Sequence, residues 1–357
     1  MKIRIEKTAN PKHIPTPEEL GDIKFGTVFT DHMLLISYLE GKGWHDARIV
    51  PYGPISLEPS ACCLHYGQLI FEGMKAYKTK DGGVVMFRPE QNMARMNESC
   101  DRMCIAPINE REALEAITEL VRTDAAWIPS VPGTALYIRP FIYADEPFLG
   151  VRPSASYTFA AILSPVGPYF KGGLAPSKIF VETKYVRAVR GGVGSAKCAG
   201  NYAASLKSLQ EPEAAGYAQV LWLDGVERKY IEEVGAMNIF FVIDGELVTP
   251  ELNGSILAGV TRKSVIDLAR GWGMKASERA ITIQELAEAH KAGIATEAFG
   301  AGTAAVIAPV GELKWLDNVM IFNDGKIGPV TQRIYDELTG IQTGALPDKF
   351  GWVYKVS

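Results

Sequence analysis

One lysine of the sequence is set apart by its neighbours. Lys197 lies in the stretch GSAKCAGNYA, where small residues rather than other charges surround it. A partly desolvated lysine loses proton affinity, so its amine can attack a carbonyl and form a Schiff base. The alternative is a solvated surface lysine, which is what most lysines are. A nucleophilic amine is therefore one of two interpretations of this position.

Two strand-like stretches contain further candidate site residues, one a carboxylate and the other a cation. Glu233 directly precedes the apolar run of YIEEVGAMNIFF, where the alternative is a surface carboxylate at the start of a strand. Tyr137 and Arg139 in ALYIRPF share one face of a strand, because side chains alternate with a period of two. An arginine at such a position is either exposed at a sheet edge or anchors an anion.

Three glycine-rich loops could present backbone N–H groups to an anion. Around Lys197, Ala196 stands where a phosphate-binding P-loop needs glycine and Cys198 replaces its Ser or Thr, which excludes that motif. The loop GAGTAA, from Gly300, matches G-x-G-x-x-A but is followed by a run too short for the helix of a dinucleotide fold. The third loop opens a predicted helix after Gly259, and helix N-termini bind phosphate.

The composition excludes several classes of protein. The chain has 357 residues, 47% hydrophobic and 22% charged, which is typical of a globular protein and not of a disordered or collagen-like one. Its 37 basic and 41 acidic side chains nearly balance, so we expect neither nucleic acid nor an anionic membrane as a partner. We find no membrane span and no signal peptide, and five cysteines without a CxxC pair indicate a cytoplasmic protein. The scattered histidines give no metal site.

Strand patterns separated by Asp-Gly turns alternate with a few amphipathic helices. Hairpins are predicted for 76–79 with 84–87 and for 238–243 with 246–249, and helices for 89–104 and 110–127. This pattern favours a mixed α/β (α+β) fold over a doubly wound parallel sheet. The Pro- and Gly-rich stretch PVGPYFKGG, 165–173, predicts a linker between two domains of similar size.

Taken together, the motifs resemble those of the fold-type IV, pyridoxal-phosphate-dependent branched-chain aminotransferases. The resemblance runs in one order over nearly the whole chain and rests on FTDHML, FEGMKAY, FRPEQNMARM, YIRP, SPVGPYF, KYVRAVRGG, SAKCAGNYAAS, EEVGAMNIFF, GVTR and GAGTA. It implies a small α/β domain over 1–168, a linker over 169–177, and a larger pseudo-barrel domain over 178–357 that carries the lysine. It also implies a homodimer with composite active sites.

The resemblance assigns cofactor roles to several residues. Lys197 would hold pyridoxal 5'-phosphate covalently and shuttle the substrate proton, and Glu233 would pair with the pyridine nitrogen. Arg95 would bind the phosphate as a charge-assisted fork. The remaining cofactor contacts would come from Val260, Thr261, Thr303, Tyr202 and Arg187.

The resemblance also implies the substrates, which are branched-chain amino acids, glutamate and their 2-oxo acids. Backbone N–H groups at Thr303 and Ala304 would hold the α-carboxylate, and Arg139 would meet the γ-carboxylate of glutamate. Tyr66 and Val151 would come from the neighbouring subunit. The apolar wall implied by the family pattern consists of Phe29, Tyr66, Phe71, Tyr137, Val151 and Tyr169.

Rival functions share part of this pattern. A D-amino acid aminotransferase or an aminodeoxychorismate lyase would keep Lys197 and Glu233 but not YIRP together with GAGTA. A binding protein would explain the loops but not the shielded lysine, and a nucleotide-dependent dehydrogenase would need the fingerprint excluded above. The sequence does not rank leucine, isoleucine and valine as substrates. Ala236, where the family pattern has Thr, leaves one cofactor hydrogen bond open.

Overall fold

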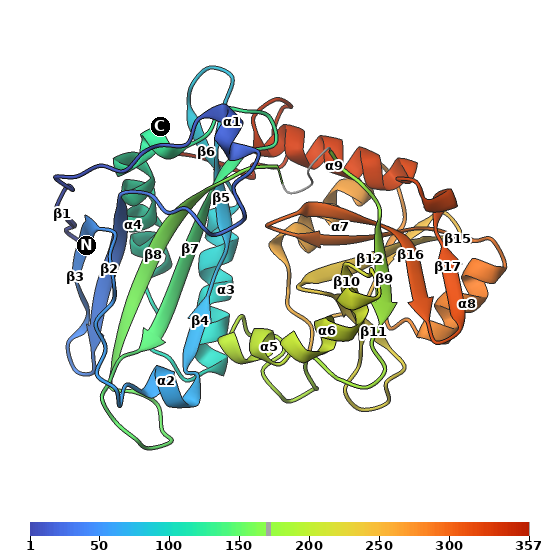
Figure 1. Cartoon of the computed structure of the whole chain (residues 1–357), viewed down its shortest axis with the longest axis horizontal. Coiled ribbons are helices and arrows are strands. Elements are labelled where there is room, and N and C mark those ends of the chain that lie inside the picture. The colour runs from blue at the N-terminus through green and yellow to red at the C-terminus, as the bar shows by residue number, and fades with distance from the viewer. Residues whose placement is uncertain (169–172, 357) are drawn as a thin grey trace. The chain divides into compact units, whose positions relative to one another are not determined.

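The computed structural model describes residues 1–168 and 173–356 and divides into two compact units (Figure 1). Unit 1 comprises Met1–Lys171, Ala196–Ala199 and Gly340–Ser357, and unit 2 comprises Gly172–Ser195 and Gly200–Thr339. The predicted domain boundaries stay a prediction, and part of the predicted linker 169–177, with Tyr169, lies outside the described residues. Lys197 itself groups with unit 1.

Unit 1 is built on a nine-stranded sheet in which β7 and β8 are the longest strands. The path through the sheet is β1-β3-β2-β8-β7-β5-β6-β18, and β4 pairs with β7. The strands are β1 Arg4–Ile5, β2 His32–Leu39, β3 Gly43–Pro51, β4 Leu69–Phe71, β5 Met74–Lys78, β6 Val84–Phe87, β7 Ala135–Ala144, β8 Ser156–Val166 and β18 Val353–Lys355.

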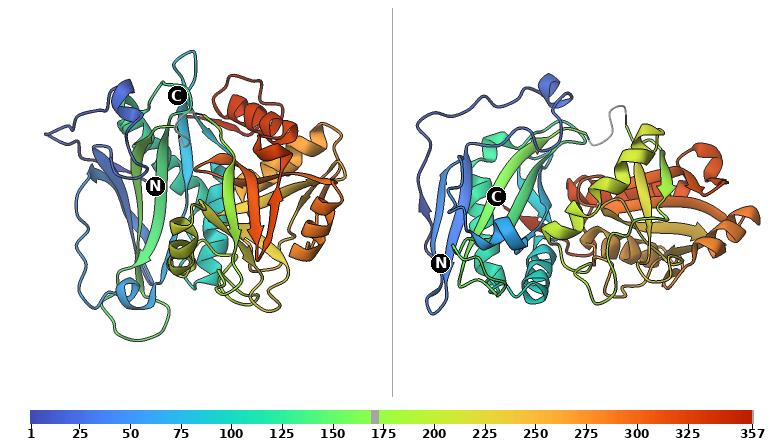
Figure 2. Two further views of the ribbon diagram at one scale, coloured as in Figure 1. Left: turned by 45° about the vertical axis from the view of Figure 1, so that its right-hand side comes forward. Right: turned by 60° about the horizontal axis from the view of Figure 1, so that its bottom comes forward.

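The two long helices of unit 1, α3 and α4, lie on one face of this sheet (Figures 1 and 2). In α3, Met93, Met96 and Cys100 are all buried and form one apolar stripe, as expected of the amphipathic helix predicted here. The helical segments of unit 1 are α1 Pro17–Leu20, α2 Cys62–Tyr66, α3 Pro89–Arg102, α4 Glu110–Thr123 and the 3-10 turn η1 Ala125–Trp127.

Both helix predictions in unit 1 extend too far at their ends. The helix predicted over 89–104 ends at Arg102. The helix predicted over 110–127 ends at Thr123 and is followed by η1. Asp124 lies at this break, and its carboxylate accepts hydrogen bonds from the backbone N–H and the Nδ1 of His32 on β2. A buried partner 92 residues away in sequence thus fixes where the helix stops.

Unit 2 contains a closed ring of strands. Its sheet follows β11-β10-β9-β16-β15-β12-β13-β14, β17 pairs with β16, and a further pairing of β11 with β12 closes the ring. This is the barrel expected from the resemblance. The strands are β9 Ser177–Val181, β10 Gln219–Leu223, β11 Ile231–Val234, β12 Met237–Ile243, β13 Glu246–Thr249, β14 Ala276–Glu278, β15 Ala295–Gly302, β16 Val306–Trp315 and β17 Asn318–Ile321.

The helix predicted to open after Gly259 is confirmed as α7. The side chain of Thr282 accepts the backbone N–H of Glu285 and caps the start of α8. Leu286 of α8 and Phe241 of β12 belong to the same buried hydrophobic cluster in the core of the unit. The helical segments are α5 Ala199–Ala203, α6 Leu206–Ala214, α7 Val260–Gly271, α8 Ile283–Lys291, the 3-10 turn η2 Asn323–Gly325 and α9 Pro329–Gln342.

Both hairpin predictions are confirmed, as is the mixed α/β class. β5 pairs with β6 around Asp81-Gly82-Gly83, and β12 pairs with β13 around Asp244-Gly245. Most strand pairs are antiparallel, with parallel exceptions such as β9 with β10. In the described part of the chain, no helix combines the length and the apolar composition that a membrane span requires.

A buried carboxylate organises the connection from β10 to β11. Asp224 is 1% exposed, and its two oxygens accept backbone N–H groups of four residues that follow it in the turn, Val226, Glu227, Lys229 and Tyr230. Burial raises the pKa of the Asp224 carboxyl, but the four donors outweigh it and leave the pKa below its usual range.

We expect Asp224→Asn to lower the free energy of unfolding at pH 7 by about 2 to 4 kcal/mol, because hydrogen bonds to a buried charge are lost. A carboxyl with a lowered pKa contributes stability that is lost as the pH falls, so the difference from the unmodified protein should shrink below about pH 4. Urea unfolding at pH 7 and at lower pH, followed by tryptophan fluorescence to which Trp222 on β10 contributes, measures both differences. The exposed turn residue Asp244 gives the control, Asp244→Asn. A difference that persists unchanged at low pH would contradict the role of the charge.

Candidate active site

The backbone around Lys197 is fixed to two elements of unit 1. The Lys197 N–H donates to Ser99 Oγ on α3 at 2.9 Å, and the Lys197 carbonyl accepts the N–H of Phe71 at 3.0 Å. The next residue, Cys198, forms an antiparallel bridge with Ile70 on β4. The lysine predicted to be nucleophilic is therefore held by hydrogen bonds on both sides.

The Lys197 side chain lies in an environment unlike that of a solvated lysine. Burial of the amine, aided by the neighbouring Arg95 and Arg139, lowers its pKa to about 8 against the opposing effects of Glu72 and Tyr137. Its Nζ lies 4.9 Å from the centre of the Phe71 ring. At pH 7 about a tenth of such amines are neutral, against about three in ten thousand for an ordinary lysine. This favours the nucleophilic interpretation.

Arg95, predicted to bind phosphate, donates hydrogen bonds to the carboxylate of Glu72, a residue that was not predicted from the sequence. Arg95 Nε and Nη2 donate to the two oxygens of Glu72, each at 2.8 Å. Asn92 Nδ2 donates to the same carboxylate at 2.9 Å, as does the N–H of Gly73 at 3.1 Å. Glu72 is fully buried. The available signal was a single charge inside the apolar stretch LIFEGM.

Arg139 in unit 1 contacts two aromatic residues, Tyr137 and Phe71. Arg139 Nη2 donates to Tyr137 Oη at 3.0 Å, and the guanidinium carbon lies 4.7 Å from the Phe71 ring centre. The buried Arg139 Nε has no hydrogen-bond partner among the described residues. Gly73 is required here, since a Cβ at this position would lie 2.1 Å from Tyr137 Oη. Three residues of the predicted substrate wall and rim are thus brought together.

Other predicted wall residues lie in different surroundings. Phe29 stacks on Tyr52 with ring centres 5.0 Å apart, whereas Phe25, which the sequence analysis did not select, packs edge-on against Tyr137 at 4.9 Å. Tyr66 is 43% exposed and Val151 is 87% exposed. Tyr169 lies outside the described residues.

In unit 2, Glu233 is buried on β11 and is not a surface residue, which excludes the alternative interpretation. It is 3% exposed, its Oε1 accepts the N–H of Leu257 at 2.7 Å, and Arg187 Nη2 lies 3.2 Å from the same oxygen. Arg187 also donates to the carbonyl of Ser255. Tyr202 is half-buried on the short helix α5.

Asn238, a second residue that the sequence analysis missed, joins the predicted anion-binding loops to Glu233. It is the strand partner of Glu233 on β11 and of Ala301 on β15, and its Nδ2 donates to the carbonyl of Leu257 at 2.9 Å. Gly259 then caps α7, where a Cβ would lie 2.1 Å from Asn238 Oδ1.

Asn238 thereby links the two segments of unit 2 that are predicted to bind an anion. Val260 and Thr261 form the first turn of α7, and Thr303 and Ala304 directly follow β15. The N-terminus of a twelve-residue helix and a glycine-rich turn both offer backbone N–H groups to an anion.

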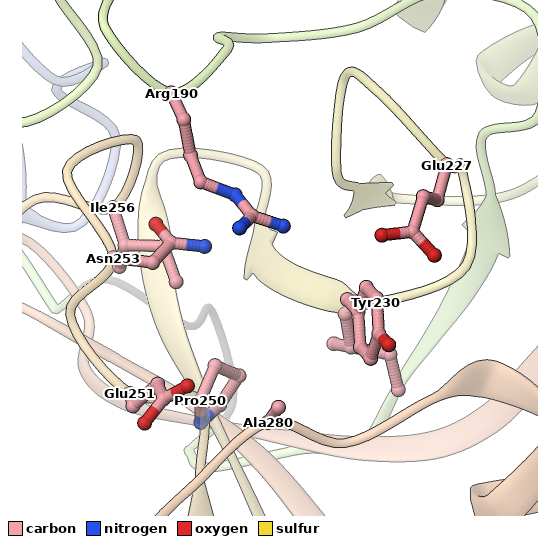
Figure 3. Close-up of a pocket in the computed structure, with 9 residues that line it drawn as sticks. Arg190, Glu227, Tyr230, Pro250, Glu251, Asn253, Ile256 and Ala280 are labelled. Carbon is pink, nitrogen blue, oxygen red and sulfur yellow. The ribbon is translucent and has the colours of Figure 1, made fainter.

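Unit 2 also has a cavity of about 240 Å³ that contains none of the predicted site residues. Figure 3 shows the side chain of Arg190 extending into it, with Asn253 on one side and Glu227 on the other. Tyr230 and Pro250 provide apolar walls. Over the described residues no cluster of three His, Cys, Asp or Glu side chains is arranged to hold a metal ion.

Comparisons with known proteins agree with the resemblance drawn from the motifs. The family model for amino-transferase class IV matches residues 69–313. Branched-chain-amino-acid aminotransferase 2 of Bacillus subtilis (strain 168) is 57% identical over 355 residues, 99% of this chain and 97% of that protein.

Two solved structures, each 28% identical in sequence, share the fold. The branched-chain aminotransferase of the archaeon Thermoproteus uzoniensis, solved with norvaline, covers 91% of this chain and 100% of its own, with a TM-score of 0.75. The branched-chain amino acid aminotransferase of Escherichia coli covers 91% of this chain and 99% of its own, with a TM-score of 0.72. These matches confirm the predicted family and fold type. The chain belongs to the class IV aminotransferase family.

Proposed function

We propose that this chain transfers the amino group of leucine, isoleucine or valine reversibly to 2-oxoglutarate, with pyridoxal 5'-phosphate as its cofactor. The observation that carries the proposal is Lys197, a half-buried amine whose pKa is about 8 and which lies beside Phe71. The substrate class is supported by the branched-chain aminotransferase at 57% identity over nearly the full length. A D-amino acid aminotransferase or an aminodeoxychorismate lyase has no such support.

The residues of the two units suit the chemistry of this cofactor. Pyridoxal 5'-phosphate, when bound, supplies a carbonyl for the lysine amine, an electron-accepting ring and a dianionic phosphate. The chain offers an amine of lowered pKa at Lys197, a buried carboxylate at Glu233 and the guanidinium of Arg95. The N-terminus of α7 at Val260 and Thr261 adds N–H donors, with further contacts assigned to Thr303, Tyr202 and Arg187.

Each of these residues has a defined task in the proposed reaction. Lys197 binds the cofactor and, as an amine of pKa about 8, accepts and returns the substrate proton at its Nζ near neutral pH. Glu233, buried in unit 2, holds a proton on the ring nitrogen through its negative charge. Arg95 binds the phosphate by charge-assisted hydrogen bonds.

The substrate is assigned to an apolar wall with one cation. Phe71 and Tyr137 would contact the branched side chain, and Thr303 and Ala304 would bind the α-carboxylate through backbone N–H groups. Glutamate brings a second carboxylate, which an apolar wall alone would leave unpaired. Arg139, with a buried Nε that has no partner among the described residues, is suited to bind it.

We infer a homodimer from an exposed apolar patch in unit 1. The patch lies on α2 and on the loop between β7 and β8, which are joined by the bridge Ala61 to Pro147 and by the hydrogen bond from the Phe148 N–H to the Ser60 carbonyl. An apolar patch of this kind is typical of an interaction surface. Its residues, between 38% and 87% exposed, are Leu64, Tyr66, Phe148, Leu149 and Val151.

All five cysteines carry free thiols. Burial raises the pKa of Cys100 to about 12, so this thiol stays protonated and unreactive. Free thiols are compatible with a reducing compartment, and a cytoplasmic location stays a prediction.

Two variants separate the roles of Lys197 and Glu233. Borohydride treatment and peptide mapping should find a pyridoxyl group on Lys197 in the unmodified protein and none in Lys197→Ala, whose turnover should fall by about 10²- to 10⁴-fold. Glu233→Gln should keep the label and lose about ten- to hundredfold in turnover, because an amide carries no charge to hold the ring proton. Lys75, whose pKa burial also lowers to about 8, gives the control Lys75→Ala. A label on Lys75 in the unmodified protein would overturn the assignment.

We expect Arg139→Met to lower kcat/KM for the glutamate half-reaction by about ten- to hundredfold, since a hydrogen bond to a charged group is lost. The leucine half-reaction should change much less. Stopped-flow measurement of the two half-reactions separates the outcomes. Equal losses would make Arg139 structural, and an unchanged glutamate reaction would remove it from the site.

We expect the unmodified protein to sediment as a dimer and Val151→Asp to shift it toward monomer with loss of activity, because a charge enters an apolar interface. Val226→Asp is the matched control, since Val226 is 67% exposed in unit 2 and not in the patch. A monomeric unmodified protein, or equal effects of both variants, would count against the proposed interface.

A further inference from the structure

Helix α3 carries a stripe of buried polar side chains beside its apolar stripe. Asn92, Arg95 and Ser99 are 2%, 6% and 1% exposed, and their spacing of three and four places them on one face. Buried polar groups are costly unless each has a partner.

Two of them bind one carboxylate, and the third binds the lysine backbone. Glu72 accepts Arg95 twice and Asn92 once, and its own neighbour Gly73 donates a fourth hydrogen bond to it. Ser99 accepts the N–H of Lys197. One face of α3 therefore fixes both the arginine and the lysine of the proposed cofactor site.

We propose that Glu72 is a positioning residue that holds the Arg95 guanidinium in the orientation in which it binds the cofactor phosphate. This inference rests on the proposed function. A guanidinium has five N–H donors, and Glu72 takes two of them through the Nε and Nη2 edge. Paired hydrogen bonds of this kind fix the plane of the guanidinium as well as its distance.

The charge of Glu72 has a second effect that a neutral side chain could not supply. Among the groups that act on the Lys197 amine are Arg95 on α3, Glu72 after β4, and Tyr137 and Arg139 on β7. Both arginines lower the pKa of Lys197, and Glu72 raises it. Removing the Glu72 charge leaves Arg95 and Arg139 less opposed, so the pKa of Lys197 should fall further.

A purely structural role would be to pin the loop after β4 to α3. The two roles make different predictions, because pinning the loop affects stability in general, whereas orienting Arg95 affects only ligands that carry a phosphate. Pyridoxal, which is the cofactor without its phosphate, distinguishes them.

The first experiment measures the dissociation constants of pyridoxal 5'-phosphate and pyridoxal for the full cofactor-free chain. We expect Glu72→Gln to reduce the preference for the phosphorylated form by about tenfold or more, since one charge-assisted contact is misoriented. Glu297→Gln is the matched control. Glu297 is a buried carboxylate of unit 2 that accepts the N–H groups of Val330 and Thr331 at the start of α9, and its loss should leave the preference unchanged.

A double-mutant cycle tests whether Glu72 acts through Arg95. In the Arg95→Gln background, Glu72→Gln should change the preference by less than about twofold, because there is no guanidinium left to orient. This double variant also removes the buried charge pair as a whole, so it guards against a single variant that fails to fold. Additive effects of the two substitutions would overturn the proposal.

Labelling of Lys197 by acetic anhydride as a function of pH provides a readout that does not use the cofactor. Its midpoint should lie near pH 8 in the unmodified chain, move to lower pH in Glu72→Gln, and return toward the unmodified value in Glu72→Asp, which keeps the charge. An unchanged midpoint in Glu72→Gln would overturn the proposal.

The outcomes also separate this proposal from the proposed function. If the unmodified chain does not prefer pyridoxal 5'-phosphate over pyridoxal, the cofactor assignment fails and this proposal fails with it. If the preference exists but Glu72→Gln and Glu297→Gln leave it equally intact, only the role of Glu72 is overturned.

Discussion

The attachment of residues Ala196–Ala199 to β4 and α3 is the constraint on which the proposed chemistry of unit 1 depends. Two backbone hydrogen bonds, one to Ser99 and one from Phe71, hold Lys197 among the side chains that lower its proton affinity. Without this attachment the amine would be solvated, and its pKa would return to that of an ordinary lysine. The nucleophile is thus created by tertiary contacts and not by the local sequence alone.

In unit 2, the register of the strands holds the proposed site residues in place. Asn238 is opposite Glu233 on one neighbouring strand and opposite Ala301 on the other, and its side chain binds the loop that leads into α7. A shift of one residue in this register would turn Asn238 to the other face of the sheet. The carboxylate and the two loops rich in N–H groups are therefore held together by the closure of the barrel.

The family and the two hairpins could be predicted from the sequence, because both depend on local patterns of residues. The neighbours of Lys197 and the motif order led to the family, and the Asp-Gly turns led to both hairpins. Glu72 and Asn238 were missed because their roles depend on tertiary contacts, which a local sequence pattern does not reveal. Glu72 is bound by polar side chains of α3, and Asn238 lies between two neighbouring strands, β11 and β15. The early end of α4 was missed for the same reason, since Asp124 is held by His32 from β2.

The two units do not correspond to the two halves of the chain. Unit 1 takes in three separate stretches of sequence, among them the four residues around Lys197 and the stretch that contains β18, which pairs with β6. No continuous fragment shorter than the full chain contains all of unit 1, and a fragment of residues 1–168 would lack both the lysine and an edge strand of its sheet. Recombination at the predicted linker would separate parts of unit 1 that pack together, so we expect the two halves of such a gene to be inherited together.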